Sequence, residues 1–109
     1  MKVKTVYNYS GIVLGNLWGG GKSAYTSIKE SGFNTIEELQ ASAENHLKKG
    51  SLDSGMGYES LIGALLLIET VETVKVNGKD FINKSLSDLY IGELTEKEIE
   101  FLDDCSYNM

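Results

Sequence analysis

The chain has 109 residues, of which 16 are acidic and 10 are basic, so its formal net charge is −6. A chain of this length can bury a hydrophobic core without a metal ion or a disulfide. Its one cysteine excludes an intrachain disulfide, and it has no arginine for bidentate contacts with phosphates. We therefore expect a single compact domain over residues 1–109 that does not bind nucleic acid directly.

No stretch of the chain is long and apolar enough to cross a membrane. The longest apolar run, Leu61 to Ile68, spans eight residues and includes a glycine, whereas a membrane helix needs about 20 residues. The first residues also lack the apolar segment of a signal peptide. These features predict a cytoplasmic protein without membrane contacts.

The first third of the chain predicts short strands. Residues 2–9 alternate imperfectly and are rich in β-branched and aromatic side chains. Ser10-Gly11 then indicates either a tight turn or a bulge, and residues 12–18 form a second strand. Residues 24–28 predict a third short strand, and Ser31-Gly32 ends the pattern.

Two helices are predicted, each beginning with a capping box of the form Thr-x-x-Glu. Thr35 is the N-cap and Glu38 the third residue of a helix over residues 36–49, which carries apolar residues at helical spacing. The second box starts at Thr95, and its helix is expected to end near Cys105.

The segment after the first helix has two interpretations. Residues 50–57 predict a glycine-rich loop. Tyr58 to Ile68 is ambiguous: its apolar residues from Tyr58 to Leu66 fit a buried helix, but Ala64 to Ile68 also fits a strand covered on both faces. We favour a helical turn at residues 58–62, followed by a long strand from about Ala64 to Val76.

Asn77-Gly78 is the strongest hairpin signal in the chain. In the predicted register Val74 faces Phe81 across the hairpin, and both side chains point into the core. Residues 85–92 are expected to be irregular. The predicted fold is α+β, an antiparallel sheet of about four or five strands with two amphipathic helices packed on one face.

Trp18 to Ser23 is the most unusual stretch, with an aromatic residue, three glycines, a cation and a hydroxyl. Its last three residues match the end of a phosphate-binding loop, but the first glycine of that motif would fall at Asn16. The residues after Ser23 favour a strand, where the motif requires a helix. We interpret the stretch as a wide glycine loop between strands rather than as a site of nucleotide hydrolysis.

Consecutive glycines can nevertheless present backbone N–H groups to an anion. In this alternative the protein binds a small molecule or a nucleotide derivative between two glycine-rich loops. The candidate anion-binding residues are Gly19, Gly20, Gly21, Lys22, Gly55 and Gly57.

No residue pattern points to catalysis, to a metal ion or to a cofactor. His46 and Cys105 are single, and no cluster of histidines and cysteines or acidic calcium loop is present. Cys105 follows two aspartates at a helix C-terminus, where a reactive thiolate is disfavoured. His46 lies beside the apolar stripe of its helix and is interpreted as a boundary residue. These observations favour a protein that is not an enzyme.

Negative charge is concentrated near the C-terminus. Residues 88–109 hold seven acidic residues and a single lysine, Lys97. An acidic face attracts a basic partner and speeds encounter with it, although such charges also occur on ordinary solvated helix faces. We expect a small interaction protein whose protein partner has a basic surface.

The concrete hypothesis is an inhibitor of a nucleic-acid-binding complex, of the kind that phages and mobile elements use against host defence. Aromatic anchors and the acidic helix would share the contact. The candidate partner-binding residues are Trp18, Lys22, Tyr25, Glu96, Glu100, Asp103 and Asp104. A self-assembling structural subunit is a third hypothesis.

Overall fold

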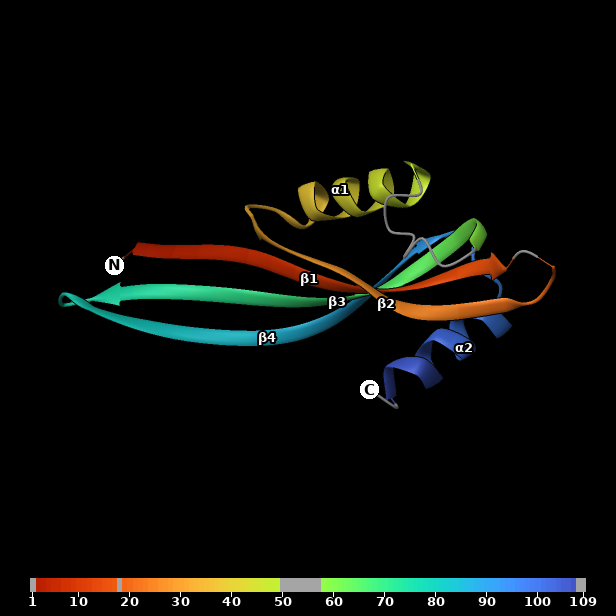
Figure 1. Cartoon of the computed structure of the whole chain (residues 1–109). Coiled ribbons are helices and arrows are strands. Elements are labelled where there is room, and N and C mark those ends of the chain that lie inside the picture. Colours follow the sequence, from red (N-terminus) through yellow and green to blue (C-terminus); the bar gives the residue numbers. More distant parts are fainter. Residues whose placement is uncertain (1, 18, 50–57, 108–109) are drawn as a thin grey trace.

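The computed structural model describes residues 2–17, 19–49 and 58–107. In chain order the elements are β1 (Lys2–Leu17), β2 (Lys22–Phe33), α1 (Ile36–Lys49), β3 (Tyr58–Val76), β4 (Lys79–Gly92) and α2 (Glu96–Tyr107). The four strands form one antiparallel sheet in the order β2-β1-β3-β4 (Figure 1). The predicted α+β class, with an antiparallel sheet and two helices, is confirmed.

The first two strands are longer than predicted. Ser10-Gly11 is not a turn, because β1 continues through it; the pairing of β1 with β2 instead shifts register between Ser10 and Ile12, as the bulge alternative requires. Ser31-Gly32 likewise lies inside β2, where Gly32 has a φ of 89°. A glycine can adopt this angle without a steric penalty, so it need not end a strand.

The second half of the sheet contains two further corrections. Tyr58–Ile62 is the start of β3 and not a helical turn, and residues 85–92 belong to β4 and are not irregular. The Asn77-Gly78 hairpin is confirmed, since both residues have positive φ, 52° and 78°, as a type I′ turn requires. Val74 pairs with Phe81 as predicted.

Both helices begin directly after the threonine of their capping box, as predicted. The Glu38 backbone N–H donates to Thr35 Oγ1 over 3.1 Å, and α1 has the predicted bounds. At α2 the box is reciprocal: the Glu98 N–H donates to Thr95 Oγ1 over 3.2 Å, and the Thr95 N–H donates to Glu98 Oε1 over 2.8 Å. α2 extends to Tyr107, slightly beyond the predicted end near Cys105.

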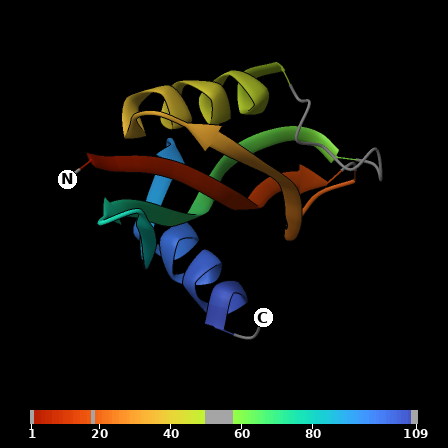
Figure 2. The same cartoon turned by 90° about the vertical axis from the view of Figure 1, so that its left-hand side faces the viewer.

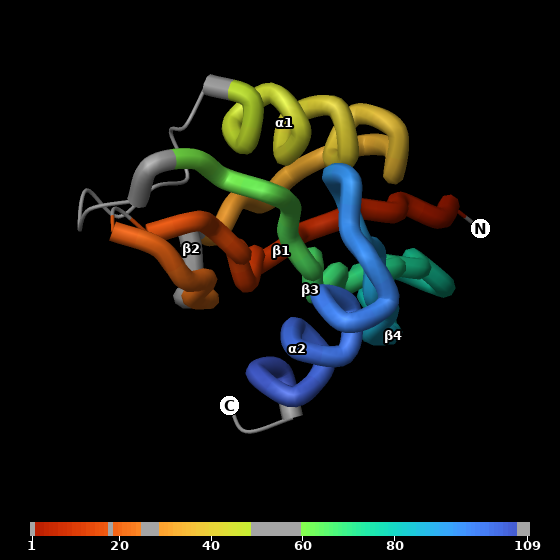
Figure 3. The backbone as a smooth tube through the Cα atoms, turned by 90° about the vertical axis from the view of Figure 1, so that its right-hand side faces the viewer, coloured from red at the N-terminus to blue at the C-terminus, as the bar shows by residue number. Residues whose placement is uncertain are grey.

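The two helices cover opposite faces of the sheet (Figures 1 and 3). The prediction that both helices pack on one face was therefore wrong. The buried cluster on the α1 side contains Tyr9, Val13, Leu39, Ala43, Ala64, Leu66, Ile68 and Ile91. The cluster on the α2 side contains Ile12, Leu14, Leu65 and Leu102. Successive residues of a strand point to opposite faces, so the continuous apolar runs at residues 12–14 and 64–66 supply both clusters.

The sheet extends well beyond the helices. The molecule measures 60 × 26 × 21 Å, and its long axis follows the strands (Figure 1). β2 ends with Phe33 opposite Tyr7, so past this point only β1, β3 and β4 continue. We call this three-stranded extension, residues 2–6, 71–76 and 79–84, the β-arm, and the remainder the body. Figure 2 views the molecule from the end of the β-arm.

The β-arm leaves large apolar side chains in solvent. Phe81 was expected to face the core, but it is 55% exposed. Val3 and Ile82, on opposite faces of the β-arm, are 56% and 60% exposed. The Val74–Phe81 pair therefore forms in the predicted register, yet it lies past the region that α1 covers (Figure 1).

Candidate functional site

α2 carries the predicted acidic surface. Glu96, Glu100, Asp103 and Asp104 are all exposed, whereas Leu102 is buried against the sheet. Helical spacing places Glu100 one turn from Glu96, from Asp103 and from Asp104. The exposed neighbours of the Phe101 ring one turn away are Lys97 and Asp104. The helix thus presents a row of carboxylates beside one apolar side chain.

Asp103 also fixes α2 to the sheet. The Tyr90 hydroxyl of β4 donates a hydrogen bond to the Asp103 carboxylate. This bond is the main reason why the pKa of Tyr90 rises to about 12, because it stabilises the protonated phenol next to a negative charge. One of the predicted partner-binding acids therefore also has a contact within the fold.

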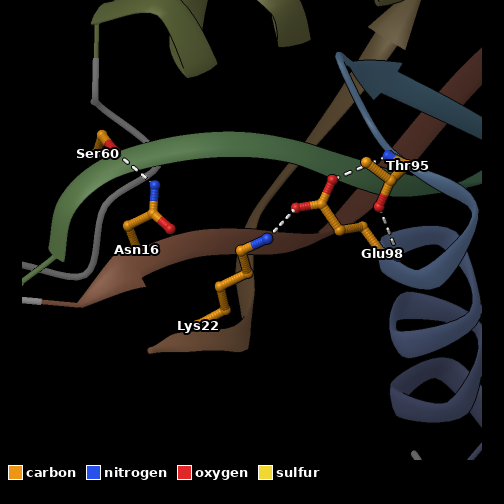
Figure 4. Close-up of polar contacts among 5 residues, drawn as sticks. All are labelled: Asn16, Lys22, Ser60, Thr95 and Glu98. Atoms are coloured by element: carbon orange, nitrogen blue, oxygen red, sulfur yellow. Dashed lines mark hydrogen bonds and ion pairs between the residues drawn. The ribbon is translucent and has the colours of Figure 1, made fainter. Parts of the chain in front are cut away.

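Lys22 points toward α2 and pairs with Glu98 (Figure 4). The Lys22 Nζ lies 2.7 Å from Glu98 Oε2, and Glu98 is only 7% exposed. The hydrogen bond from Lys22, reinforced by the Thr95 backbone N–H, lowers the pKa of Glu98 below its ordinary value of 4.5. The sequence did not predict this contact, because its residues are 76 positions apart.

Two backbone hydrogen bonds close the glycine loop between β1 and β2. Gly19, Gly20 and Gly21 are exposed and have φ of 90°, 101° and 89°. The Leu17 N–H donates to the Gly21 carbonyl over 3.0 Å, and the Gly20 N–H donates to the Leu17 carbonyl over 3.2 Å. These bonds close the connection from both sides, as a wide turn between antiparallel strands requires.

Two of the donors proposed for an anion are thus already engaged. The Gly20 N–H is bound within the turn, and the Lys22 ammonium is bound to Glu98. Gly55 and Gly57 lie outside the described residues, so the opposing wall of that site stays a prediction, and so does the small-molecule alternative. Trp18 lies outside them as well, and Tyr25 is placed by its backbone in β2, opposite Val13.

A polar cluster that the sequence did not indicate ties α1 to β2. The Glu30 carboxylate accepts a hydrogen bond from Ser42 Oγ over 3.0 Å and lies 2.7 Å from His46 Nε2. Burial and the neighbouring Glu30 charge raise the pKa of Tyr9 to about 12. Since Ser42 and His46 both contact Glu30, the cluster fastens the helix to the sheet. His46 is half-buried, as expected of a boundary residue.

A groove of about 560 Å³ lies at the base of the β-arm. Its floor is crossed by a hydrogen bond from Asn8 Nδ2 to Glu69 Oε1 over 3.1 Å. Leu86 of β4 stands at the groove with 82% of its surface exposed. The groove mixes polar and apolar groups, and Lys29 and Glu30 place both signs of charge along it.

Strand pairing also separates charge along the molecule. In the β-arm, Lys2 pairs with Lys75, which lies far from it in the sequence. Lys75 in turn pairs with Asp80 across the hairpin. In total the β-arm holds Lys2, Lys4, Lys75, Lys79 and Lys84 against Glu72 and Asp80. The β-arm is therefore basic, whereas α2 is acidic.

In the described residues, no three histidine, cysteine, aspartate or glutamate side chains gather as the ligands of a metal ion would. None of the helices in that part of the chain is long and apolar enough to span a bilayer. The chain matches no protein-family model, no curated protein and no solved structure. Its function must therefore be argued from its own surfaces.

Proposed function

We propose that the protein is a non-enzymatic binding protein whose α2 face contacts a basic surface on a protein partner. The observation that carries this proposal is the row of four exposed carboxylates, Glu96, Glu100, Asp103 and Asp104, beside the exposed ring of Phe101. Charged groups steer the encounter of two proteins, and a desolvated aromatic ring supplies affinity at its centre.

The position of these acids supports a role beyond solubility. A row of like charges at helical spacing destabilises a helix slightly. Asp103 and Asp104 also lie toward the C-terminal end, where the helix dipole favours cations, and the last turn of α2 contains no basic residue. Local stability is thus reduced at this face, which is common at functional surfaces.

The class of partner follows from the charge. Proteins that bind nucleic acids present lysine- and arginine-rich surfaces to the phosphate backbone. A small acidic protein that covers such a surface competes with the nucleic acid. We therefore propose an inhibitor of a nucleic-acid-binding complex, of the kind that phages and mobile elements direct against host defence.

The test compares two charge reversals of equal size. The partner is first captured from an extract of the native host on the immobilised full chain. Its affinity is then measured for Asp103→Lys/Asp104→Lys and for the control Glu37→Lys/Glu44→Lys, in which two exposed acids of α1 are replaced. Both variants change the net charge by the same amount; because the α2 variant also removes the Tyr90–Asp103 hydrogen bond, circular dichroism checks that it keeps the helix content of the unmodified chain.

We expect the α2 variant to bind roughly tenfold or more weakly and to show a flatter dependence on salt. The α1 control should retain the affinity of the unmodified chain. Equal affinities for all three proteins would exclude the acidic face as the binding surface.

A further inference from the structure

The two edges of the sheet differ in a way that points to a further contact. The pairing of β2 with β1 is interrupted by two register shifts, and such irregularities protect an edge strand from pairing with other chains. β4 pairs with β3 over 14 consecutive residue pairs without a shift. In the described residues no strand pairs with the outer edge of β4. β4 therefore presents a long, regular and open edge.

The hairpin determines which backbone groups line this edge. In a two-residue type I′ hairpin, the residues that flank the turn, Val76 and Lys79, exchange hydrogen bonds. Bonded and non-bonded pairs then alternate along the ladder, so odd-numbered residues of β4 bond to β3. The N–H and C=O groups of the even-numbered residues, from Asp80 to Tyr90, point outward and are available to another strand.

We infer that β4 pairs antiparallel with β4 of a second copy of this chain, about a twofold axis that passes through Leu86. The outward-pointing residues of the two copies then exchange backbone hydrogen bonds. Leu86 lies opposite Leu86 of the second copy, Lys84 lies opposite its Asp88, and the two sheets join into one of eight strands.

Charge complementarity and the length of the paired segment favour this register. A twofold axis through Leu86 places Lys84 of each copy opposite Asp88 of the other, so this contact forms twice. Opposite charges across a strand pair are favourable. An axis through Lys84 would instead place two Lys84 side chains opposite each other and Asp80 opposite Asp88. An axis through Ile82 would leave only residues 79–85 paired.

The same register covers apolar side chains that are exposed in one copy. Leu86 is 82% exposed and meets its symmetry mate, and Ile82 lies opposite Tyr90 of the second copy. All three residues share the face of the sheet on which Ile12 and Leu65 pack with α2. α2 packs mainly over β1 and β3 and contacts β4 through Tyr90, near the end of the strand.

The test uses the oligomeric state of the full chain and a pair of complementary variants. Sedimentation equilibrium measures the mass of the unmodified chain, of Lys84→Asp, of Asp88→Lys and of an equimolar mixture of the two variants. All the replaced side chains are exposed, so folding should be preserved and is checked by circular dichroism. Lys29→Asp, an exposed lysine on the other edge strand, is the control for the change of charge.

We expect the unmodified chain and the Lys29→Asp control to be dimers. Each β4 variant brings like charges together at two symmetry-related positions, so its dimer should be weakened by about tenfold or more. The mixture should recover the dimer, because a pair made of one copy of each variant has opposite charges at both contacts between positions 84 and 88. A monomeric unmodified chain, a Lys84→Asp dimer of unchanged affinity or a mixture no tighter than either variant would each overturn the inference.

Discussion

The body and the β-arm share the strands β1, β3 and β4 but hold together by different means. In the body, Ala64, Leu65 and Leu66 of β3 are buried because helices cover both faces of the sheet. In the β-arm the same strand continues as Val71 to Val76, with no residue fully buried. A strand in one fold can thus pass from a packed core into an extension that no helix covers.

The residues of β3 match this division. The body segment contains leucine, isoleucine and alanine, which contribute through burial. The arm segment alternates valine and threonine with charged residues, and β-branched side chains favour extended backbone even when they are half exposed. Cross-strand contacts such as Val74 with Phe81 then stabilise the β-arm locally.

The largest expected difference between the two regions is in amide hydrogen exchange along β3. Local opening requires a free energy close to zero in weakly packed segments, and one close to that of global unfolding in the core. In the Lys84→Asp variant, in which the proposed dimer is weakened, amides at residues 71–76 should exchange orders of magnitude faster than those at residues 64–68. Equal protection along β3 would show that the β-arm unfolds together with the body.

Core truncation should separate the regions next. Leu65 is fully buried on the α2 side, so Leu65→Ala should lower the free energy of unfolding by about 2–5 kcal/mol. Val3→Ala removes an exposed β-arm side chain and should change it by about 0.5 kcal/mol or less. Urea denaturation measures both values, and similar losses would contradict the description of the β-arm as unpacked.

Glycine substitutions test how tightly the body is packed where β4 ends. A Cβ added at Gly92 would lie 2.5 Å from the Ile62 carbonyl oxygen, and the φ of Gly92 is 91°. Gly92→Ala should therefore destabilise by about 1–3 kcal/mol. Gly32→Ala is the matched control, because Gly32 has a φ of 89° and open space around it. Equal melting temperatures for the two variants would mean that strand β4 shifts to relieve the contact.

The smallest expected effect concerns the ion pair that joins β2 to α2. Glu98 has a lowered pKa in the folded state, so its contribution to stability is present above its ordinary value of 4.5 and is lost as the pH falls through the lowered value. Lys22→Met removes the main cause of this lowering, so its melting temperature should fall less on acidification than that of the unmodified chain. Lys48→Met, at an exposed lysine of α1, should behave like the unmodified chain. Identical acid profiles for all three would contradict the Lys22–Glu98 pair.

Local signals in the sequence were sufficient for the helix starts and for the hairpin. A capping box and an Asn-Gly turn act over four residues, so Thr35, Thr95 and Asn77 could be interpreted without tertiary information. The bulge alternative at Ser10-Gly11 is confirmed, whereas the strand end predicted at Ser31-Gly32 was wrong, because neighbouring strands hold a glycine in the sheet as an irregularity.

The sequence did contain a signal for helices on both faces of the sheet. Ala64 to Ile68 was considered as a strand covered on both faces, and such a strand requires a cover on each side of the sheet. The contacts that define the candidate surfaces had no local signal. The Lys22–Glu98 pair and the lysines of the β-arm depend on the strand order, which joins segments about 70 residues apart.

The continuity of β3 has a mechanical consequence. Its 19 residues run through the body and the β-arm, and its register with both neighbours is unbroken from Ala64 to Lys75. A load applied at the Asn77-Gly78 tip, parallel to the strands, would therefore be shared by many backbone hydrogen bonds in shear. The paired strands of the β-arm can thus transmit tension from the tip to the packed core.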